Sequence, residues 1–238
     1  MLLTPIATFC SPFESKFGIP RQSGLAANLR GEIVFEPEYR NVDFLRGIEE
    51  FDFLWLLWEF SANRHQATSP VVRPPLLGGN ERVGVFATRS PFRPNPVGLS
   101  SVRLDYVEWQ SARGPVVHVL GADLMDGTPI FDIKPYIVYA DSHPDVRSGF
   151  VDNHRWERLS VEIPTEVACL FNADELVALQ QTLELDPRPH YHNSEKKVYG
   201  MPFAGYDIRF CVSGGVCRVT EAVKIGAPSG NNTVDDAG

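Results

Sequence analysis

Residues 73–103 read RPPLLGGNERVGVFATRSPFRPNPVGLSSVR. The stretch holds five arginines and one acid, Glu81, so its net charge is +4 in a chain whose total is -8. Proline fixes φ and lacks a backbone donor, so the segment 90–96 cannot form a helix or an inner strand. We expect a stiff loop that presents Arg89 and Arg93. The density of prolines and arginines favours a functional loop over a surface loop with solvated arginines.

Strand-like runs rich in Val, Ile, Leu and aromatic residues surround this loop. They lie at residues 5–10, 32–35, 51–60, 82–88, 98–107, 115–122 and 129–140. The run 51–60, FDFLWLLWEF, fits a strand buried on both faces, although a buried helix has the same pattern. Trp55 and Trp58 in this run are expected in the core. Many short strands without a long amphipathic helix predict a mainly β fold, either a barrel or a sandwich.

The segment 11–25 is a long connection dense in Pro, Gly and Ser. We expect it to be ordered because it carries four apolar residues that can pack, namely Phe13, Phe17, Ile19 and Leu25. Arg21 and Gln22 follow Pro20, which makes them candidates for polar contacts with a ligand. A solvated surface position explains them equally well.

The chain beyond residue 165 has a different pattern. Residues 172–185 predict a helix with Asn172 as its N-cap, Glu175 at the third position and Pro187 beyond its end. The runs 206–212 and 216–225 predict a hairpin. The expected organisation is a β domain at 1–150, a connector at 151–165, a small α+β domain at 166–225 and a disordered tail at 226–238.

Three polar residues alternate along the run FDIKPY, which follows an Asp-Gly turn signal. Asp132, Lys134 and Tyr136 are two apart, so in a strand they share one face. They could handle a proton in a reaction. An ordinary solvent face with a salt bridge has the same pattern, and both interpretations stay open.

Composition excludes several classes of protein. A net charge of -8 argues against non-specific nucleic-acid binding, DNA included, while the basic stretch allows a local patch. The apolar run 51–60 is too short to span a membrane. The four cysteines show no metal spacing, and His190 and His192 have no evident third ligand, so we expect no metal. Free thiols indicate a reducing compartment, and we expect a cytoplasmic protein.

The sequence also lacks the motifs of several enzyme families. No GxGxxG, GxxxxGK[ST], HExxH or GxSxG is present. Taken by themselves, the residues indicate a β-rich protein with a rigid cationic site. Together with a second basic and aromatic patch in the small C-terminal module, this site suits an anionic ligand with flat groups, such as RNA.

Several segments together resemble the TsaA-like family, the TrmO-type tRNA methyltransferases. These segments are PRQSGL at 20–25, the long motif at 73–100, DGTPIFDIKPY at 126–136, DPRPHYH at 186–192 and YGMPFAGYDIRF at 199–210. The resemblance implies a β-barrel domain with a small C-terminal α+β domain. It also implies an enzyme that uses S-adenosylmethionine (SAM) to methylate the exocyclic nitrogen of N6-threonylcarbamoyladenosine at position 37 of tRNA.

The resemblance further implies which residues bind SAM and how the protein assembles. By motif position, the cofactor contacts are Pro20, Arg21, Gln22, His65, Gln66, Arg89, Leu99, Asp126, Gly127, Thr128 and Pro129. The expected assembly is a homodimer with SAM near the subunit interface, acting on the tRNA anticodon loop.

The chemistry of methyl transfer suggests roles for further residues. Transfer from a sulfonium is an in-line displacement that requires positioning and no metal. The acceptor nitrogen is a poor nucleophile until it loses a proton, and we expect Asp132, Lys134 or Tyr136 to assist that loss. The candidates for contacts with tRNA phosphates are Arg93, Arg188, Lys196, Lys197 and Arg209. A β module that binds SAM or RNA without catalysis is the alternative.

Overall fold

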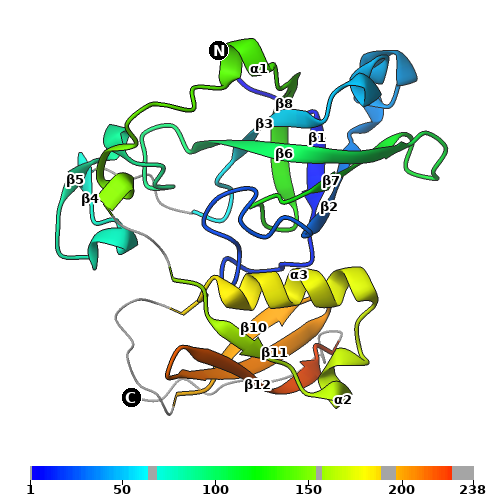
Figure 1. Ribbon diagram of the computed structural model, residues 1–238. Helices are drawn as coiled ribbons and strands as arrows, with labels where there is room; N and C mark the ends of the chain where they lie inside the picture. The colour runs from blue at the N-terminus through cyan, green and yellow to red at the C-terminus, as the bar shows by residue number, and fades with distance from the viewer. Residues whose placement is uncertain (1, 64–68, 154–156, 189–196, 227–238) are drawn as a thin grey trace, which may run out of the picture.

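The N-terminal domain is a closed antiparallel β-barrel. The computed structural model describes residues 2–63, 69–153, 157–188 and 197–226. The barrel strands are hydrogen-bonded in the order β1-β2-β7-β6-β3-β8, and β8 closes back onto β1 (Figure 1). Their bounds are Ala7–Cys10 (β1), Arg30–Phe35 (β2), Phe53–Glu59 (β3), Val97–Glu108 (β6), Val116–Leu120 (β7) and Thr128–Pro135 (β8). The expected mainly β class is confirmed, as a barrel rather than a sandwich.

Alternation along each strand fills the barrel. In β3, Leu54, Leu56 and Trp58 face the core, whereas Phe53 remains 42% exposed. The expectation that this run is buried on both faces is therefore wrong, because only alternate residues of a barrel strand reach the interior. Trp58 belongs to the core as predicted. Trp55 instead lies half-buried on the outer surface, against the ring of Tyr136.

Three long connections leave the barrel at the same end. Because the strands are antiparallel, the ends of β1, β3 and β7 lie beside the starts of β2, β6 and β8. The connections at this end are 11–29, 60–96 and 121–127. Most of the predicted cofactor residues lie on these three connections, so the topology itself gathers them.

Two predicted strands are shorter in the structure. The run 82–88 contains only β5 (Val83–Gly84), paired with β4 (Val71–Val72), and then turns into a 3-10 helix at Val85–Ala87. The prolines that follow β4 leave β5 without a longer partner. The run 129–140 stays extended only to Pro135, because its neighbour β3 begins at Phe53, and α1 (Val138–Asp141) follows.

The C-terminal domain is a four-stranded sheet covered by a helix. The sheet order is β10-β11-β12-β9, with β10 at Tyr199–Phe203, β11 at Tyr206–Ser213, β12 at Val216–Lys224 and β9 at Ser160–Glu162. β9 lies inside the expected connector 151–165 and pairs in parallel with β12. α2 spans Thr165–Ala168 and α3 spans Ala173–Glu184. The predicted capping box of α3 forms between Asn172 and Glu175.

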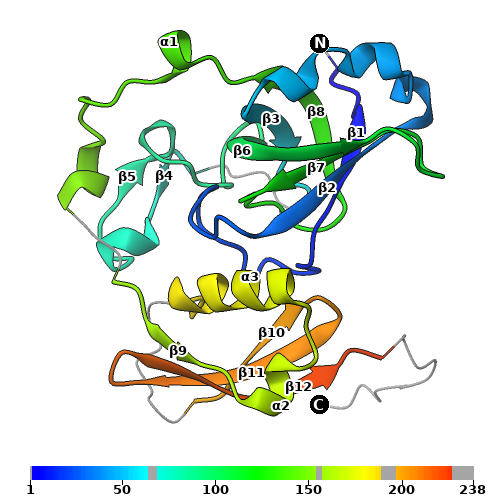
Figure 2. The same cartoon turned by 45° about the vertical axis from the view of Figure 1, so that its right-hand side comes forward.

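The connection 11–29 joins the two domains. It lies between the barrel and α3 in both views (Figures 1 and 2). Phe13 is fully buried, and its ring centroid is 5.4 Å from that of Phe203 in β10. Ala26 and Leu29 belong to the same core as Leu179 of α3. The expectation of an ordered connection is confirmed, since its apolar residues help to form the core of the C-terminal domain.

All four cysteines are free, and burial raises the pKa of the Cys217 thiol to about 12. Cys217 lies opposite Val212, not opposite Cys211. Within the described ranges, no helix has both the length and the apolar composition needed to cross a membrane.

Candidate functional site

Two of the long connections pack directly on each other at the barrel end. The backbone N–H of Gly24 donates to the carbonyl of Gly121 at 2.8 Å. Gly121 has a φ of +76°, a conformation that favours glycine, and a Cβ there would lie 3.3 Å from Gly24. The connection 121–127 therefore lies against the segment 20–25, which carries the first predicted cofactor residues.

The predicted Asp126–Pro129 segment forms the turn into β8. Asp126 Oδ1 accepts a hydrogen bond from the Ser11 backbone at 2.9 Å, and the Gly127 N–H donates to the Phe9 carbonyl at 2.9 Å. Thr128 is buried and donates to the Met125 carbonyl, whereas Asp126 and Gly127 are exposed. Hydrogen bonds to β1 and its following connection thus fix the turn, while Asp126 and Gly127 remain accessible to a ligand.

Gln22 and Arg89 meet across two connections. Arg89 Nη1 donates to Gln22 Oε1 at 2.5 Å, and Gln22 Nε2 donates to the Arg21 carbonyl at 2.6 Å. Pro20, just before them, is buried. The structure therefore brings together an amide and a guanidinium that the sequence separates widely.

Arg21 points away from this pair. Its guanidinium donates to the carbonyls of Leu185 and Asp186 at 3.3 and 3.1 Å, at the C-terminal end of α3. Burial lowers the pKa of Arg21, and Asp186 acts in the opposite direction. A cation at a helix C-terminus is favoured by the unsatisfied carbonyls there, so this arginine holds the connection against the C-terminal domain.

Arg93 stiffens the Pro-rich loop. Its Nη1 donates to the carbonyls of Thr88 and Ser90, at 3.2 and 3.4 Å. The loop is therefore fixed by its own guanidinium as well as by its prolines. Phe86 and Phe92 in the same connection are 80% and 52% exposed, which is unusual for phenylalanine.

Leu99 and Asp132 lie on the outer surface of the barrel. Both are paired with Leu57 of β3, Leu99 from β6 and Asp132 from β8. Neighbouring cross-strand residues are about 5 Å apart, so Leu99 and Asp132 are separated by about 10 Å. Leu99 is 53% exposed.

The row Asp132, Lys134 and Tyr136 follows this outer surface. Asp132 and Lys134 form an ion pair at 2.8 Å, and the Tyr136 ring contacts those of Phe53 and Trp55. Strands rise about 3.3 Å per residue, so Tyr136 lies about 26 Å along the chain from Thr128. Asp132 is the member of the row nearest to the barrel end that carries the connections.

A part-buried carboxyl group, Asp123, lies among these residues and was not predicted. Its Oδ1 accepts a hydrogen bond from Ser100 Oγ at 2.5 Å. Desolvation raises the pKa of Asp123, while the Ser100 hydroxyl, backbone amides and Arg89 act in the opposite direction. An acid between buried Ala122 and Leu124, just after a buried strand, was the signal that the sequence offered.

The predicted phosphate contacts of the C-terminal domain have partners within the protein. Arg188 forms an ion pair with Asp186 at 2.8 Å, and Arg209 pairs with both Asp207 and Glu221. Lys197 Nζ lies 5.2 Å from the centroid of the Tyr199 ring. Three further predicted residues, His65, Gln66 and Lys196, lie outside the described residues, as do His190 and His192.

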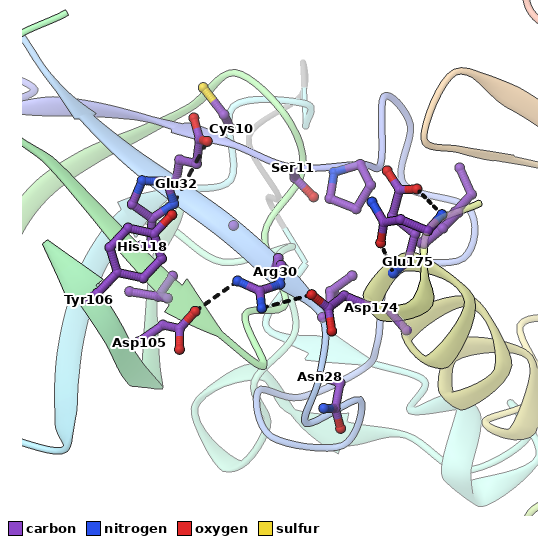
Figure 3. A pocket seen from close by; sticks show the side chains of 17 residues that line it. Cys10, Ser11, Asn28, Arg30, Glu32, Asp105, Tyr106, His118, Asp174 and Glu175 are labelled. Carbon is purple, nitrogen blue, oxygen red and sulfur yellow. Dashed lines mark hydrogen bonds and ion pairs between the residues drawn. The ribbon is translucent and has the colours of Figure 1, made fainter. Parts of the chain in front are cut away.

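Two pockets adjoin the connection 11–29. A pocket of about 250 Å³ is lined by the predicted residues Pro20, Arg21 and Arg188, together with Asp186. A pocket of about 460 Å³ lies between barrel and α3, where the Arg30 guanidinium pairs with Asp105 and Asp174 (Figure 3).

The charged groups that line the larger pocket already have partners within the protein. Glu32 forms an ion pair with Arg113, which does not line the pocket. Glu175 belongs to the capping box of α3 (Figure 3). In the part of the chain that the structure describes, no three His, Cys, Asp or Glu side chains come together as a metal site. The larger pocket is therefore a contact surface between the domains.

Comparison with known proteins gives a consistent match. Residues 8–142 match the family model for the tRNA-methyltransferase O N-terminal domain, and residues 157–225 match that for the TrmO C-terminal domain. The chain is 38% identical to the tRNA (adenine(37)-N6)-methyltransferase of Escherichia coli K12, over 91% of this chain and 92% of that protein. It is 36% identical to a Pseudomonas aeruginosa protein named as a putative S-adenosylmethionine-dependent methyltransferase, RcsF, over 87% and 91%.

Solved structures agree with this match. A crystal structure of TrmO from P. aeruginosa superimposes with a TM-score of 0.76 at 31% identity, covering 94% of this chain and 97% of that one. The barrel, its loop-bearing end and the small α+β domain define a β-barrel methyltransferase without a Rossmann domain. The chain belongs to the tRNA-methyltransferase O family over both of its domains.

Proposed function

We propose that the protein transfers the methyl group of SAM to the exocyclic nitrogen of N6-threonylcarbamoyladenosine at position 37 of tRNA. The observation that carries this proposal is the convergence of Gln22, Arg89 and Asp126 at one end of the barrel, on motifs that match the family. A tRNA substrate would place the enzyme in the cytoplasm.

The residues at the barrel end fit SAM chemically. The Arg89 guanidinium suits the carboxylate of the methionine moiety, and the Gln22 amide can both donate and accept. The exposed Asp126–Gly127 turn offers a carboxylate and backbone groups to the ammonium or the ribose hydroxyls. Bound SAM supplies an electrophilic methyl group, and the protein's part is to hold it in line with the acceptor nitrogen.

The acceptor nitrogen needs to lose a proton, and we assign that task to the row Asp132, Lys134 and Tyr136. Asp132 and Lys134 form an ion pair at 2.8 Å, which holds a carboxylate and an ammonium side by side on this surface. We expect the single-turnover rate to fall in Asp132→Asn, Lys134→Met or Tyr136→Phe, with Glu49→Gln as an exposed control. A variant that keeps the wild-type rate, with binding intact, removes that residue from the proposal.

A homodimer explains how this row could meet the cofactor. The outer surface around the row is apolar and exposed, with Phe53 at 42%, Leu99 at 53% and Val138 at 72%. Such a surface is typical of an interface. We propose that a second copy covers it and brings its own loop-bearing end close to Asp132. Sedimentation of wild type and a Leu99→Glu variant tests this, since the charge should yield monomers.

The connection 60–96 supplies the proposed tRNA surface. Arg73 and Arg82 are exposed, and the ion pairs between described residues involve other arginines. With Arg93 they can bind phosphates, while the exposed rings of Phe86 and Phe92 can stack on unpaired bases of the anticodon loop. In the C-terminal domain, the proposed phosphate contacts are still Arg188, Lys197 and Arg209. Each also interacts with another residue of the protein: an acidic group for the two arginines, and the Tyr199 ring for Lys197.

Transfer of labelled methyl from SAM to tRNA tests the function directly. Bulk tRNA with the threonylcarbamoyl modification is compared with tRNA that lacks it. Incorporation only into modified tRNA is the expected result. SAM binding without incorporation into either tRNA would instead favour a different acceptor or a non-catalytic binding module.

A further inference from the structure

The carboxyl group of Asp123 is anchored from the barrel core by two side chains. Ser100 Oγ donates to Asp123 Oδ1 at 2.5 Å and accepts a hydrogen bond from Trp58 Nε1 at 3.0 Å. Ser100 is 2% exposed and Trp58 is 7% exposed. The core therefore fixes one side of the carboxyl group.

The local sequence of β6 makes this arrangement possible. Gly98 and Ser100 are two apart and both face inward. A Cβ on Gly98 would lie 2.3 Å from the Trp58 ring, so only glycine leaves room for the indole beside Ser100. The spacing Gly-Leu-Ser thus places a hydrogen-bonded hydroxyl under the Asp123 carboxyl group and leaves Leu99 on the outer surface.

The connection that carries Asp123 packs on the segment that carries Gln22, because the Gly24 N–H donates to the Gly121 carbonyl at 2.8 Å. The backbone amide of Ser23 and the charge of Arg89 both favour its ionised form. Ser23 directly follows Gln22, whose side chain accepts the hydrogen bond from Arg89. Asp123 therefore lies beside the segment that carries Gln22, and its charge attracts the Arg89 guanidinium to which Gln22 is hydrogen-bonded.

The charge of Asp123 is unfavourable for folding, which suggests that it has a function. Among the described residues Asp123 has no ion-pair partner, and burial raises the pKa of its carboxyl group. A desolvated carboxylate without a cation in contact disfavours folding, whereas asparagine would fill the same space without that charge. Since Arg89 is the cation whose charge favours the ionised carboxyl group, the charge of Asp123 acts in turn on that side chain.

We propose that Asp123 is a positioning residue, whose charge holds Arg89 and the Gln22–Ser23 backbone in the orientation that binds SAM. This inference rests on the proposed function and adds to it a residue that does not contact the cofactor. On this proposal, the affinity for SAM depends on Asp123, which links Ser100 in the barrel core to the connections that carry Gln22 and Arg89.

Calorimetric titration of SAM into purified protein tests the proposal separately from methyl transfer. Asp123→Asn keeps the shape of the side chain and removes its charge. We expect it to raise the Kd for SAM about tenfold, as expected when a charge-assisted interaction is removed, and to change kcat at saturating SAM less than about threefold. Asp52→Asn, an exposed acid at the other end of the barrel, should keep the wild-type Kd.

A double-mutant cycle with Arg89→Met identifies the path of the effect. If Asp123 acts through Arg89, Asp123→Asn adds little to the weaker binding already caused by Arg89→Met. Additive effects, or a Kd for Asp123→Asn within twofold of wild type, would overturn the proposal. Ser100→Ala provides the second variant if Asp123→Asn does not fold, and it should also weaken SAM binding non-additively with Arg89→Met.

The outcomes for the two proposals remain distinct. Wild-type protein that binds SAM but methylates no tRNA contradicts the proposed function and leaves the role of Asp123 to be decided by the cycle. Wild-type protein that binds no SAM contradicts both.

Discussion

Arg89 Nη1 donates to Gln22 Oε1 at 2.5 Å, which ties the Pro-rich loop to the connection that follows β1. Each side chain comes from a different connection, and both connections leave the barrel at the same end. The hydrogen bond therefore fixes the relative position of two segments that must act together on one ligand. Replacing either Arg89 or Gln22 tests whether this hydrogen bond matters for ligand binding.

Replacing Arg89 with lysine should weaken SAM binding. Lysine keeps the charge but lacks the planar fork of donors that can serve Gln22 and a carboxylate at once. Loss of a hydrogen bond to a charged group costs about 1.5–3 kcal/mol, or roughly a tenfold to hundredfold rise in Kd. Calorimetry measures it, with Arg46→Lys as the matched control, because Arg46 is exposed and pairs only locally with Asp43. An unchanged Kd would separate Arg89 from the cofactor.

Neutralising Arg73 or Arg82 should make tRNA binding less sensitive to salt. The slope of log K against log salt concentration becomes shallower by about 0.7–0.9 for each phosphate that the protein no longer neutralises. The slope is measured by fluorescence anisotropy over a range of KCl concentrations. Arg46→Gln serves again as control. A residue whose replacement leaves the slope unchanged belongs to the solvated surface.

Phe86→Ala and Phe92→Ala should weaken tRNA binding without changing its salt slope. Stacking of one base on an aromatic ring contributes about 1–3 kcal/mol and neutralises no phosphate. Both rings are exposed, so truncation leaves no cavity in the core. Phe44→Ala, 65% exposed near the other end of the barrel, is the control. Wild-type affinity in both variants would assign these rings to another surface, such as the dimer interface.

Much of the fold follows from local sequence signals, because each signal acts within a few residues. The alternation in β11 predicts its buried face, and Asn172 with Glu175 predicts the start of α3. The predicted ends of strands were less accurate, since β5 and β8 end where the strands paired with them end. The pairing of β9 with β12 depends on residues more than fifty positions apart, and no local pattern reports it.

The candidate site shows the same division. The motifs predicted that Gln22, Arg89 and Asp126 belong together, and the shared barrel end places all three on neighbouring connections. Motifs did not indicate that Arg21 reaches α3, because adjacent residues in a loop can point in opposite directions. Asp123 was not predicted as a site residue, because its interactions with Ser100 and Ser23 form only in the folded chain.

The Asp186–Arg188 pair should make stability depend on pH in the acid range. Burial tends to raise the pKa of Asp186, but Arg188, a backbone amide and Arg21 outweigh it and hold the pKa below its ordinary value. A lowered folded-state pKa stabilises the protein above the unfolded pKa of about 3.9, and this contribution disappears as pH falls through the folded value.

The test of this pair compares wild type with Asp186→Asn. Asn tolerates the positive φ of +51° at this position, so the backbone is preserved. Wild type should be more stable at neutral pH, and the difference should shrink on acidification below about pH 4. Urea unfolding at a series of pH values measures it. A difference that is the same at every pH would contradict a role for the carboxylate charge.

Arg21 and Arg30 both link the domains, and their replacement should have unequal effects on stability. Arg30 pairs with Asp105 and Asp174 at half-exposed positions, and such surface pairs contribute at most about 1 kcal/mol. Arg21 is more enclosed and satisfies two carbonyls at the end of α3, so its replacement leaves part-buried acceptors without this donor. We expect Arg21→Met to lower the free energy of unfolding by about 1–3 kcal/mol and Arg30→Met by less. Urea unfolding measures both, and SAM titration of the same variants separates the two roles of Arg21. If Arg21→Met keeps wild-type stability but no longer binds SAM, the guanidinium serves the cofactor and not the contact between the domains.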